Sequence, residues 1–271
     1  MRKLLKSLKL IVGIVLVLAL VAILAVNLLA ESAVRVAVET AGTKALSVAV
    51  ELEAAKLSIT GGALTLHDLT VTNPPGYQHD TLLKLHQGDI QVQTKTLLSD
   101  EIQIKDIQLN GMDLVIEQKG LGNNLQDVIK AAQRGEKEPS GKKLYVDNLE
   151  LTDVTVNVKL LHVPGKVDTV TLALAPIKMT DLGKNERLDT ATLTAKIMLA
   201  VAAGIAQQGT DVLPKEMING LTSVLGTAVD LGRIILGTGQ EAGEGIQKGV
   251  ESIGQGITEG LKGILAPKKD E

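Results

Sequence analysis

The sequence predicts an α+β protein in which a curved antiparallel β-sheet, built as a meander with short helices, lies between an N-terminal transmembrane helix and C-terminal glycine-rich helices. Three observations support this prediction. An apolar run opens the chain, alternating apolar and polar residues fill its middle, and alanine- and glycine-rich segments with helical spacing follow. We therefore divide the chain into a basic tail (1–9), an anchor (10–30), a sheet domain (31–188) and a helical tail (189–271).

The anchor is predicted from four basic residues between Arg2 and Lys9, followed by an apolar run from Leu10 to Ala30. At ~1.5 Å per residue this run is ~31 Å long, which matches the core of a bilayer. The basic flank precedes the run and Glu31 follows it, so the positive-inside rule predicts a single pass with the N-terminus cytoplasmic and the bulk of the chain exported. A cleaved signal peptide fits less well, because its apolar region would be shorter and would end in small residues at both cleavage positions.

One strand pattern occurs three times in the middle of the chain, at Leu64–Val71, Ile102–Leu109 and Leu144–Leu151. Each copy alternates apolar and polar residues, reaches an Asp or Asn, and restarts the alternation one residue out of phase. A slip of one residue turns side chains to the other face of a sheet unless the backbone bulges. We therefore expect a bulge or tight turn at Asp68, Asp106 and Asn148, and three copies indicate a repeated sheet unit.

The segment from Ser32 to about Val48 has helical spacing and joins the anchor to the first strand, so we expect an amphipathic helix near the membrane surface. Strand patterns then run from Leu57 to Gln118, separated only by short turns rich in glycine and proline. Short connections of this kind predict an antiparallel meander with one apolar and one polar face.

A short helix is predicted from Asn124 to Gln133, with Asn124 as its N-cap. Strand patterns resume at Leu144–Leu160 and Val167–Ala175, and we expect the sheet to end near Gly183.

Three helices are predicted after the sheet, at Thr190–Gln207, from Pro214 to about Leu236, and at Glu241–Leu265. The first is rich in alanine, and it is too short and too polar at its ends to be a second membrane span. The third helix carries a row of glycines at Gly245, Gly249, Gly256, Gly260 and Gly263. Small residues at such spacing allow close helix packing. The partner would be the Pro214 helix, another copy of the chain in a homo-oligomer, or a membrane surface; the alternative is a weakly ordered tail.

The composition excludes several kinds of chemistry. There is no cysteine, and aromatic residues make up 1% of the chain, which leaves no thiolate ligand and no stacking platform for bases. With a net charge of −3, no nucleic-acid partner is expected. His67–Asp68 and His79–Asp80 are neighbours in sequence, and neighbours in a strand point to opposite faces, so no metal site is predicted. No nucleophile turn or phosphate loop is present, so we expect no catalytic residue, no cofactor and no enzymatic activity.

Several motifs in the first half of the chain belong together: the anchor, Gly42–Leu46, Gly62–Leu66, Asn73–Tyr77, Leu97–Asp100, Ile102–Leu109 and Leu114–Glu117. Together they resemble the opening of AsmA-like proteins, a family related to TamB and the chorein-type bridge proteins. The resemblance covers roughly residues 1–133 and more weakly the strands to about Gly183. It implies a bacterial inner-membrane protein whose bulk lies in the periplasm, with a groove-shaped sheet and a role in envelope lipid homeostasis. Its implied partners are phospholipid or an envelope protein complex.

The resemblance also implies which residues line the groove, on one register of the strands or on the opposite one after each slip. The candidate lipid-contacting residues are Leu64, Leu66, Ile102, Ile104, Leu114 and Ile116. At ~4.8 Å per strand, about eight strands span ~38 Å, too little to bridge a periplasm alone. We therefore weigh lipid handling against a structural protein that assembles through its glycine-rich helices. The two differ in whether helices after Asp189 cover the apolar face.

Overall fold

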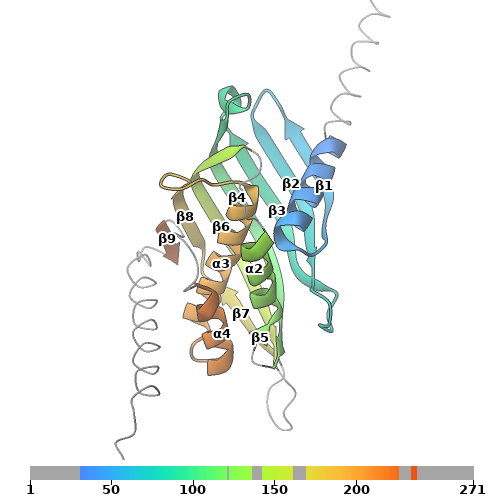
Figure 1. Ribbon diagram of the computed structural model, residues 1–271, viewed down its shortest axis with the longest axis vertical. Helices are drawn as coiled ribbons and strands as arrows, with labels where there is room; N and C mark the ends of the chain where they lie inside the picture. The colour runs from blue at the N-terminus through green and yellow to red at the C-terminus, as the bar shows by residue number, and fades with distance from the viewer. Residues whose placement is uncertain (1–30, 121, 136–141, 161–168, 226–232, 237–271) are drawn as a thin grey trace, which may run out of the picture.

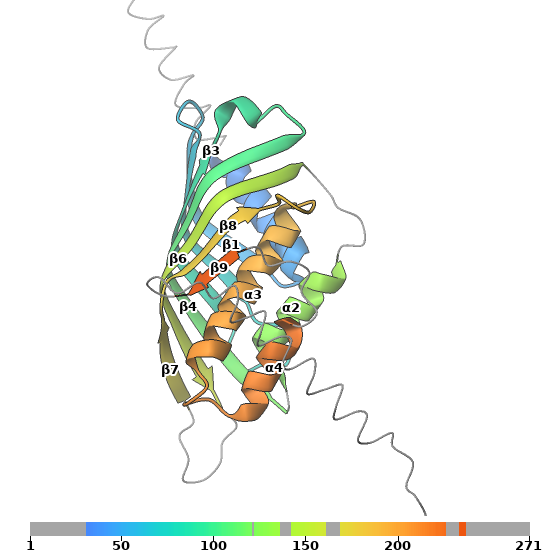
Figure 2. The ribbon, with the colours of Figure 1, turned by 90° about the vertical axis from the view of Figure 1, so that its left-hand side faces the viewer.

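A computed structural model describes residues 31–120, 122–135, 142–160, 169–225 and 233–236. These residues form one curved sheet with helices on its concave side (Figures 1 and 2). The predicted anchor and the predicted helix at Glu241–Leu265, with its row of glycines, lie outside the described residues.

The described chain opens with a helix over residues 31–46, as predicted. Val34 and Val38 on its inner face pack on Leu52 and Leu66 of the sheet. The helix lies along the edge strand β1 (Val50–Ser58), where Thr43 Oγ1 accepts the backbone N–H of Val50 and Glu39 Oε1 accepts that of Leu52, each at 3.0 Å. Helix side chains therefore satisfy amides that an edge strand would leave unpaired.

The first four strands are antiparallel neighbours, which confirms the predicted meander for this part of the chain. They are β1, β2 (Ala63–Thr72), β3 (Thr81–Val92) and β4 (Glu101–Lys119), with a short helix η1 (Thr94–Thr96) between the last two.

The meander prediction is wrong at the step from β4 to β6, although the later strand pairs are again antiparallel. After the two-residue strand β5 (Gly122–Asn123), the helix α2 (Asn124–Gly135) carries the chain back toward the start of β4. The next strand, β6 (Lys143–Lys159), therefore runs parallel to β4. A parallel pair needs a crossover connection, and α2 is part of it.

The N-cap of α2 is Asn123, whose Oδ1 accepts the backbone N–H of Gln126 at 2.9 Å. Asn124, the predicted cap, forms hydrogen bonds to β4 instead. Its Oδ1 accepts the backbone N–H of Glu117 at 3.0 Å, and its amide donates to the carbonyl of Val115 at 2.8 Å, which ties the start of the helix to β4.

Three further strands complete the sheet: β7 (Thr169–Leu174), β8 (Ile177–Leu182) and β9 (Arg233–Leu236). The order is β1-β2-β3-β4-β6-β8-β9, with β5 on β4 and β7 on β6. The sheet therefore does not end near Gly183. The predicted helix from Pro214 to Leu236 is also too long, because α4 is described over Lys215–Leu225 and residues 233–236 form a strand against β8.

The helix α3 (Thr190–Gln208) begins at Asp189, whose Oδ1 accepts the backbone N–H of Thr192 at 2.9 Å. Within the described part of the chain it is the one helix long and apolar enough to cross a membrane, yet it packs on the sheet with Val201 and Ile205 fully buried. Small residues permit this close approach: a Cβ on Gly204 would lie 3.1 Å from Ile177 Cδ1. Residues 190–225 thus share one core with the sheet.

The predicted slip at Asp68 is confirmed, with a φ of 50°. It belongs to a row of unpaired positions that crosses five neighbouring strands at Glu53, Asp68, His86, Gly111 and Asp153. Gly111 (φ 69°) and Asp153 (φ 54°) also have left-handed backbones. Because all five strands slip together, the apolar residues on both sides of the row face the same side of the sheet.

The slips predicted at Asp106 and Asn148 occur one residue earlier. Ile104 pairs with Val146 and Asp106 with Asn148, which leaves Lys105 and Asp147 unpaired side by side. Asp181 on β8, with a φ of 58°, continues this second row.

Candidate functional site

The concave face of the sheet is apolar, and helices cover one part of it. Near the carboxyl end of β4, Leu114 and Ile116 are fully buried. There α2 contacts β4 and α4 contacts β5, while α3 lies over β7 and β8 (Figure 2). Two of the candidate lipid-contacting residues are thus enclosed by the protein's own helices.

Apolar side chains at the other end of the concave face remain half-buried. They are Leu64 on β2, Ile90 and Val92 on β3, and Ile102 on β4, which we call the apolar strip. Leu64 pairs with Ile90, so the strip is continuous across these two strands.

The strip borders the core and is continued by buried residues. Val92 pairs with Ile104, which is 7% exposed, and Leu66 is 6% exposed. Of the six candidate lipid-contacting residues, Leu64 and Ile102 are therefore accessible, Leu66 and Ile104 lie at the border, and Leu114 and Ile116 are covered. Ile90 and Val92 were read from the sequence only as strand residues, because alternation does not show which part of a face the helices leave uncovered.

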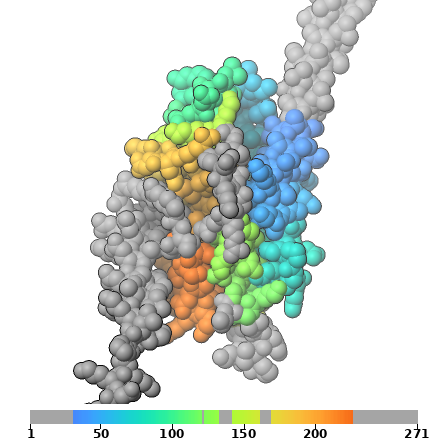
Figure 3. Space-filling view, in the orientation of Figure 1, coloured from blue at the N-terminus to red at the C-terminus, as the bar shows by residue number. Residues whose placement is uncertain are grey.

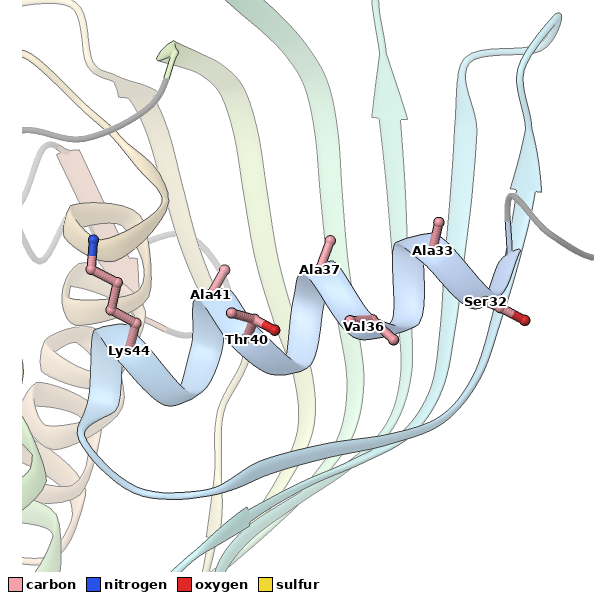
Figure 4. A pocket seen from close by; sticks show the side chains of 7 residues that line it. All are labelled: Ser32, Ala33, Val36, Ala37, Thr40, Ala41 and Lys44. Carbon is pink, nitrogen blue, oxygen red and sulfur yellow. The ribbon is translucent and has the colours of Figure 1, made fainter.

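The helix over residues 31–46 adds a second apolar surface beside the sheet. Ala33, Ala37 and Ala41 point the same way at four-residue spacing, and Val36 beside them is 55% exposed (Figure 4). With Ser32, Thr40 and Lys44 they line a shallow hollow of about 630 Å³. The space-filling view shows this helix as a ridge along one side of the molecule (Figure 3).

A polar pocket of about 520 Å³ lies where this helix meets the sheet edge. Its lining consists of Arg35, Glu39, Glu51, Leu52, Glu53, Asp68, Thr70, Lys84 and His86. His86 has Nδ1 3.3 Å from Asp68 Oδ1 and Nε2 3.3 Å from Asp113 Oδ2. Hydrogen bonding to Asp68, then to Asp113, raises the pKa of His86 above its usual value. The lining carries four carboxylates, on Glu39, Glu51, Glu53 and Asp68, and three basic side chains, on Arg35, Lys84 and His86. No cluster of three or more metal-ligating side chains occurs among the described residues.

A buried carboxylate fastens the β2–β3 connection, which contains the Asn73–Tyr77 motif, to the sheet. Glu117 on β4 is 6% exposed and accepts the backbone N–H groups of Gln78 at 2.8 Å and His79 at 2.7 Å. Burial alone would raise the pKa of Glu117, but these hydrogen bonds and one from the His79 ring outweigh it and hold the pKa below its usual value.

The same motif also contacts α2. Tyr77 donates its hydroxyl to Asp127 Oδ2 at 2.6 Å, and burial together with this carboxylate raises the pKa of Tyr77. The motif thus joins β4 to α2 and has a structural role in the described residues. Sequence reasoning missed Glu117 because its partners are 38 and 39 residues away.

The AsmA family model matches residues 1–157, which is more than half of the chain and extends through β6 almost to its end. No curated protein matches the sequence. Members of this family are envelope-associated, and by this match the chain belongs to the AsmA family.

Proposed function

We propose that this chain is a non-enzymatic, membrane-anchored envelope protein that holds the acyl chain of a lipid on its apolar strip. The main support for this proposal is an apolar surface that the helices leave half-exposed, formed by Leu64, Ile90, Val92 and Ile102. Covering such a surface with an acyl chain gains ~0.8 kcal/mol per buried methylene. In this proposal residues 10–30 anchor the chain in the inner membrane, and the sheet lies in the periplasm.

The size of the strip limits what it can hold. It spans β2, β3 and β4, which lie ~4.8 Å apart, so it is about 10 Å wide. Elsewhere on the concave face, the helix over residues 31–46 packs on Leu52 and Leu66, and α2, α3 and α4 share the main core with the sheet. We therefore propose that the protein shields part of one lipid and does not by itself conduct lipids between two membranes.

Native mass spectrometry of the full chain, released in gentle detergent, tests this proposal. We expect the protein to retain phospholipid, and Leu64→Asn or Ile102→Asn to reduce the retained fraction several-fold. Val212→Asn is the matched control, because Val212 is a 51% exposed apolar residue at the turn between α3 and α4. Polar substitutions of Leu114 are unsuitable, since that side chain is fully buried and the variant would unfold.

Equal lipid retention by wild type and both strip variants, with native circular dichroism, would contradict lipid holding. So would complete absence of lipid from the wild type after reconstitution with phospholipid.

A structural assembly function is the second candidate, because α2, α3 and α4 cover Leu114, Ile116 and most of the concave face. In that case copies associate through the predicted glycine row at 245–263, outside the described residues. The same spectra give the subunit count. A lipid-free oligomer that Gly249→Leu or Gly256→Leu dissociates would support assembly and exclude the first proposal.

A further inference from the structure

Three large apolar side chains are exposed together at one end of the sheet. Ile59 in the β1–β2 turn is 54% exposed, and Leu97 and Leu98 in the β3–β4 connection are 37% and 97% exposed. Figures 1 and 2 show both connections at the top of the molecule, where η1 lies. Only two other large apolar residues among those described, Val36 and Val212, are exposed to this degree. A cluster of this kind on a protein surface marks an interaction site more often than scattered exposed residues do.

The backbone holds the two connections beside each other. The carbonyl of Gly62 accepts the backbone N–H of Val92 at 2.7 Å, and the carbonyl of Gly61 accepts the side-chain amide of Gln91 at 2.8 Å. Gly62 has a φ of 64° and its Cα approaches Val92 so closely that a Cβ there would lie 2.4 Å from the Val92 carbonyl oxygen. The exposed leucines thus extend from a structured end of the sheet.

The first described residues lie at this same end. Thr43 contacts Val50 and Glu39 contacts Leu52, while Val34 packs in the cluster with Ala55. The helix therefore runs antiparallel to β1, and residue 31 lies toward the Ile59 turn (Figure 1). The apolar run predicted to cross the membrane, residues 10–30, directly precedes it.

We infer that Ile59, Leu97 and Leu98 form a membrane-docking tip that inserts into the interfacial region of the bilayer in which the chain is anchored. Two lysines flank these side chains. Lys95 is exposed within η1, and Lys142 donates its ammonium group to the Leu97 carbonyl at 2.7 Å. The exposed Asp100 and Glu101 end the same connection, and Glu101 pairs with Lys143 at 2.6 Å. Lysines beside apolar tips can keep their charge among lipid headgroups while the apolar side chains enter the acyl region.

The tip also gives the apolar strip a position relative to the bilayer. Leu64 follows Gly62 by two residues, Val92 precedes Thr94 by two, and Ile102 is the second residue of β4. The half-exposed strip therefore starts at the tip. If the tip sits in the bilayer, an acyl chain reaches the strip without crossing water. The docking inference does not depend on lipid holding, because an assembly protein could have the same tip.

Site-specific fluorescence on the full chain tests the tip, and the absence of native cysteine makes single labelling straightforward. Leu98→Cys and the control Val212→Cys are each labelled with an environment-sensitive nitrobenzoxadiazole dye. The proteins are reconstituted into vesicles of phosphatidylethanolamine and phosphatidylglycerol, with and without lipids that carry a doxyl quencher near the headgroup. Both leaflets contain quencher, so the direction of insertion does not matter.

We expect the dye at position 98 to show blue-shifted emission and several-fold stronger doxyl quenching than the dye at position 212. Adding Ile59→Ser and Leu97→Ser should weaken the quenching at 98, with the fold checked by circular dichroism. Equal quenching at 98 and 212 would overturn the inference, because the folded part would then have no preferred end toward the bilayer. A blue shift at 98 without doxyl quenching would also overturn it, since that result indicates burial against protein. Either failure leaves the lipid retention measured by mass spectrometry unaffected, so the two proposals are tested separately.

Discussion

The carboxylate of Glu117 lies 2.9 Å from Nδ1 of His79, although 38 residues separate them in the chain. The same carboxylate accepts the backbone N–H of His79 and that of Gln78. One buried side chain therefore holds the connection between β2 and β3 against the carboxyl half of β4, close to the start of α2.

Replacing Glu117 with Gln should lower the free energy of unfolding by about 1–3 kcal/mol, because a neutral amide cannot satisfy the same donors as a carboxylate. The pKa of Glu117 is lower in the folded state, so its contribution is complete above the usual glutamate pKa and is lost as the pH falls through the lowered value. Thermal unfolding of the wild type between pH 7 and pH 3 should show this loss, and Glu117→Gln should reduce the pH dependence.

The control for this experiment is Glu150→Gln, which removes an exposed ion pair with Lys178 at 3.1 Å. Exposed pairs contribute about 0–1 kcal/mol. If the two variants lose equal stability, the Glu117 cluster does not have the role assigned to it.

Asp68→Asn should lower the pKa of His86 toward the ordinary histidine value, because the hydrogen bond to Asp68 is the largest cause of its elevation. Asparagine tolerates the left-handed backbone at this position, so the bulge should persist. NMR titration of the histidine ring protons measures the change, with His86→Gln to assign the signal. Charged His86 stabilises the folded protein fully below the usual histidine pKa. This contribution to stability is lost as the pH rises through the raised pKa of His86. An unchanged pKa in Asp68→Asn would exclude this pairing in solution.

Gly111→Ala should destabilise the protein by about 1–2 kcal/mol, because the backbone there has a positive φ and the new Cβ would lie 3.0 Å from His86 Cδ2. Gly88→Ala is the matched control on the neighbouring strand. Its Cβ would make ordinary contacts, 3.4 Å from Leu109 Cδ2 and 3.5 Å from Leu85 Cδ2. Melting temperatures should fall by about 2–4 °C per kcal/mol for Gly111→Ala and change little for Gly88→Ala. Equal effects would show that the row of slips imposes no special backbone requirement.

Leu114→Ala and Ile102→Ala should differ in cost although both residues face the concave side of β4. Leu114 is fully buried under the helices, so its truncation leaves a cavity and should cost about 2–5 kcal/mol. Ile102 is half-buried and should cost about 1 kcal/mol. Denaturant unfolding of the lipid-free protein measures both. Similar losses would mean that the strip is covered in solution.

The three copies of the strand pattern show which features of the sheet the sequence predicts and which it does not. Their alternation predicted the strands and the presence of phase slips correctly. The second and third copies lie side by side and pair residue for residue, from Ile102 with Leu144 to Leu109 with Leu151. Matching slips at Lys105 and Asp147 keep the two strands in register. The similarity of the two copies is therefore explained by a parallel contact that the meander prediction excluded.

For the candidate site, the sequence also predicted the residues, and the tertiary structure decided which of them are accessible. All six proposed groove residues lie on the side of the sheet that packs against the helices, whereas the sequence left the opposite register open after each slip. Only two of them are accessible, because the alanine-rich α3 and the helices α2 and α4 fill the remainder. The sequence predicted α3 as a helix but did not indicate which surface it would cover.

The sequence by itself determined the position of most strands and of α2 and α3, the apolar character of one sheet face, and the motifs that resemble the AsmA family. The tertiary structure decided that β4 and β6 are parallel, that β9 joins the sheet, and that the described helices leave the concave face half-exposed toward the Leu98 end. The physical reason is that side-chain periodicity is a local property, which specifies the face a residue occupies. Strand direction and helix cover depend on where a crossover returns the chain and on which distant surfaces fit closely enough to pack.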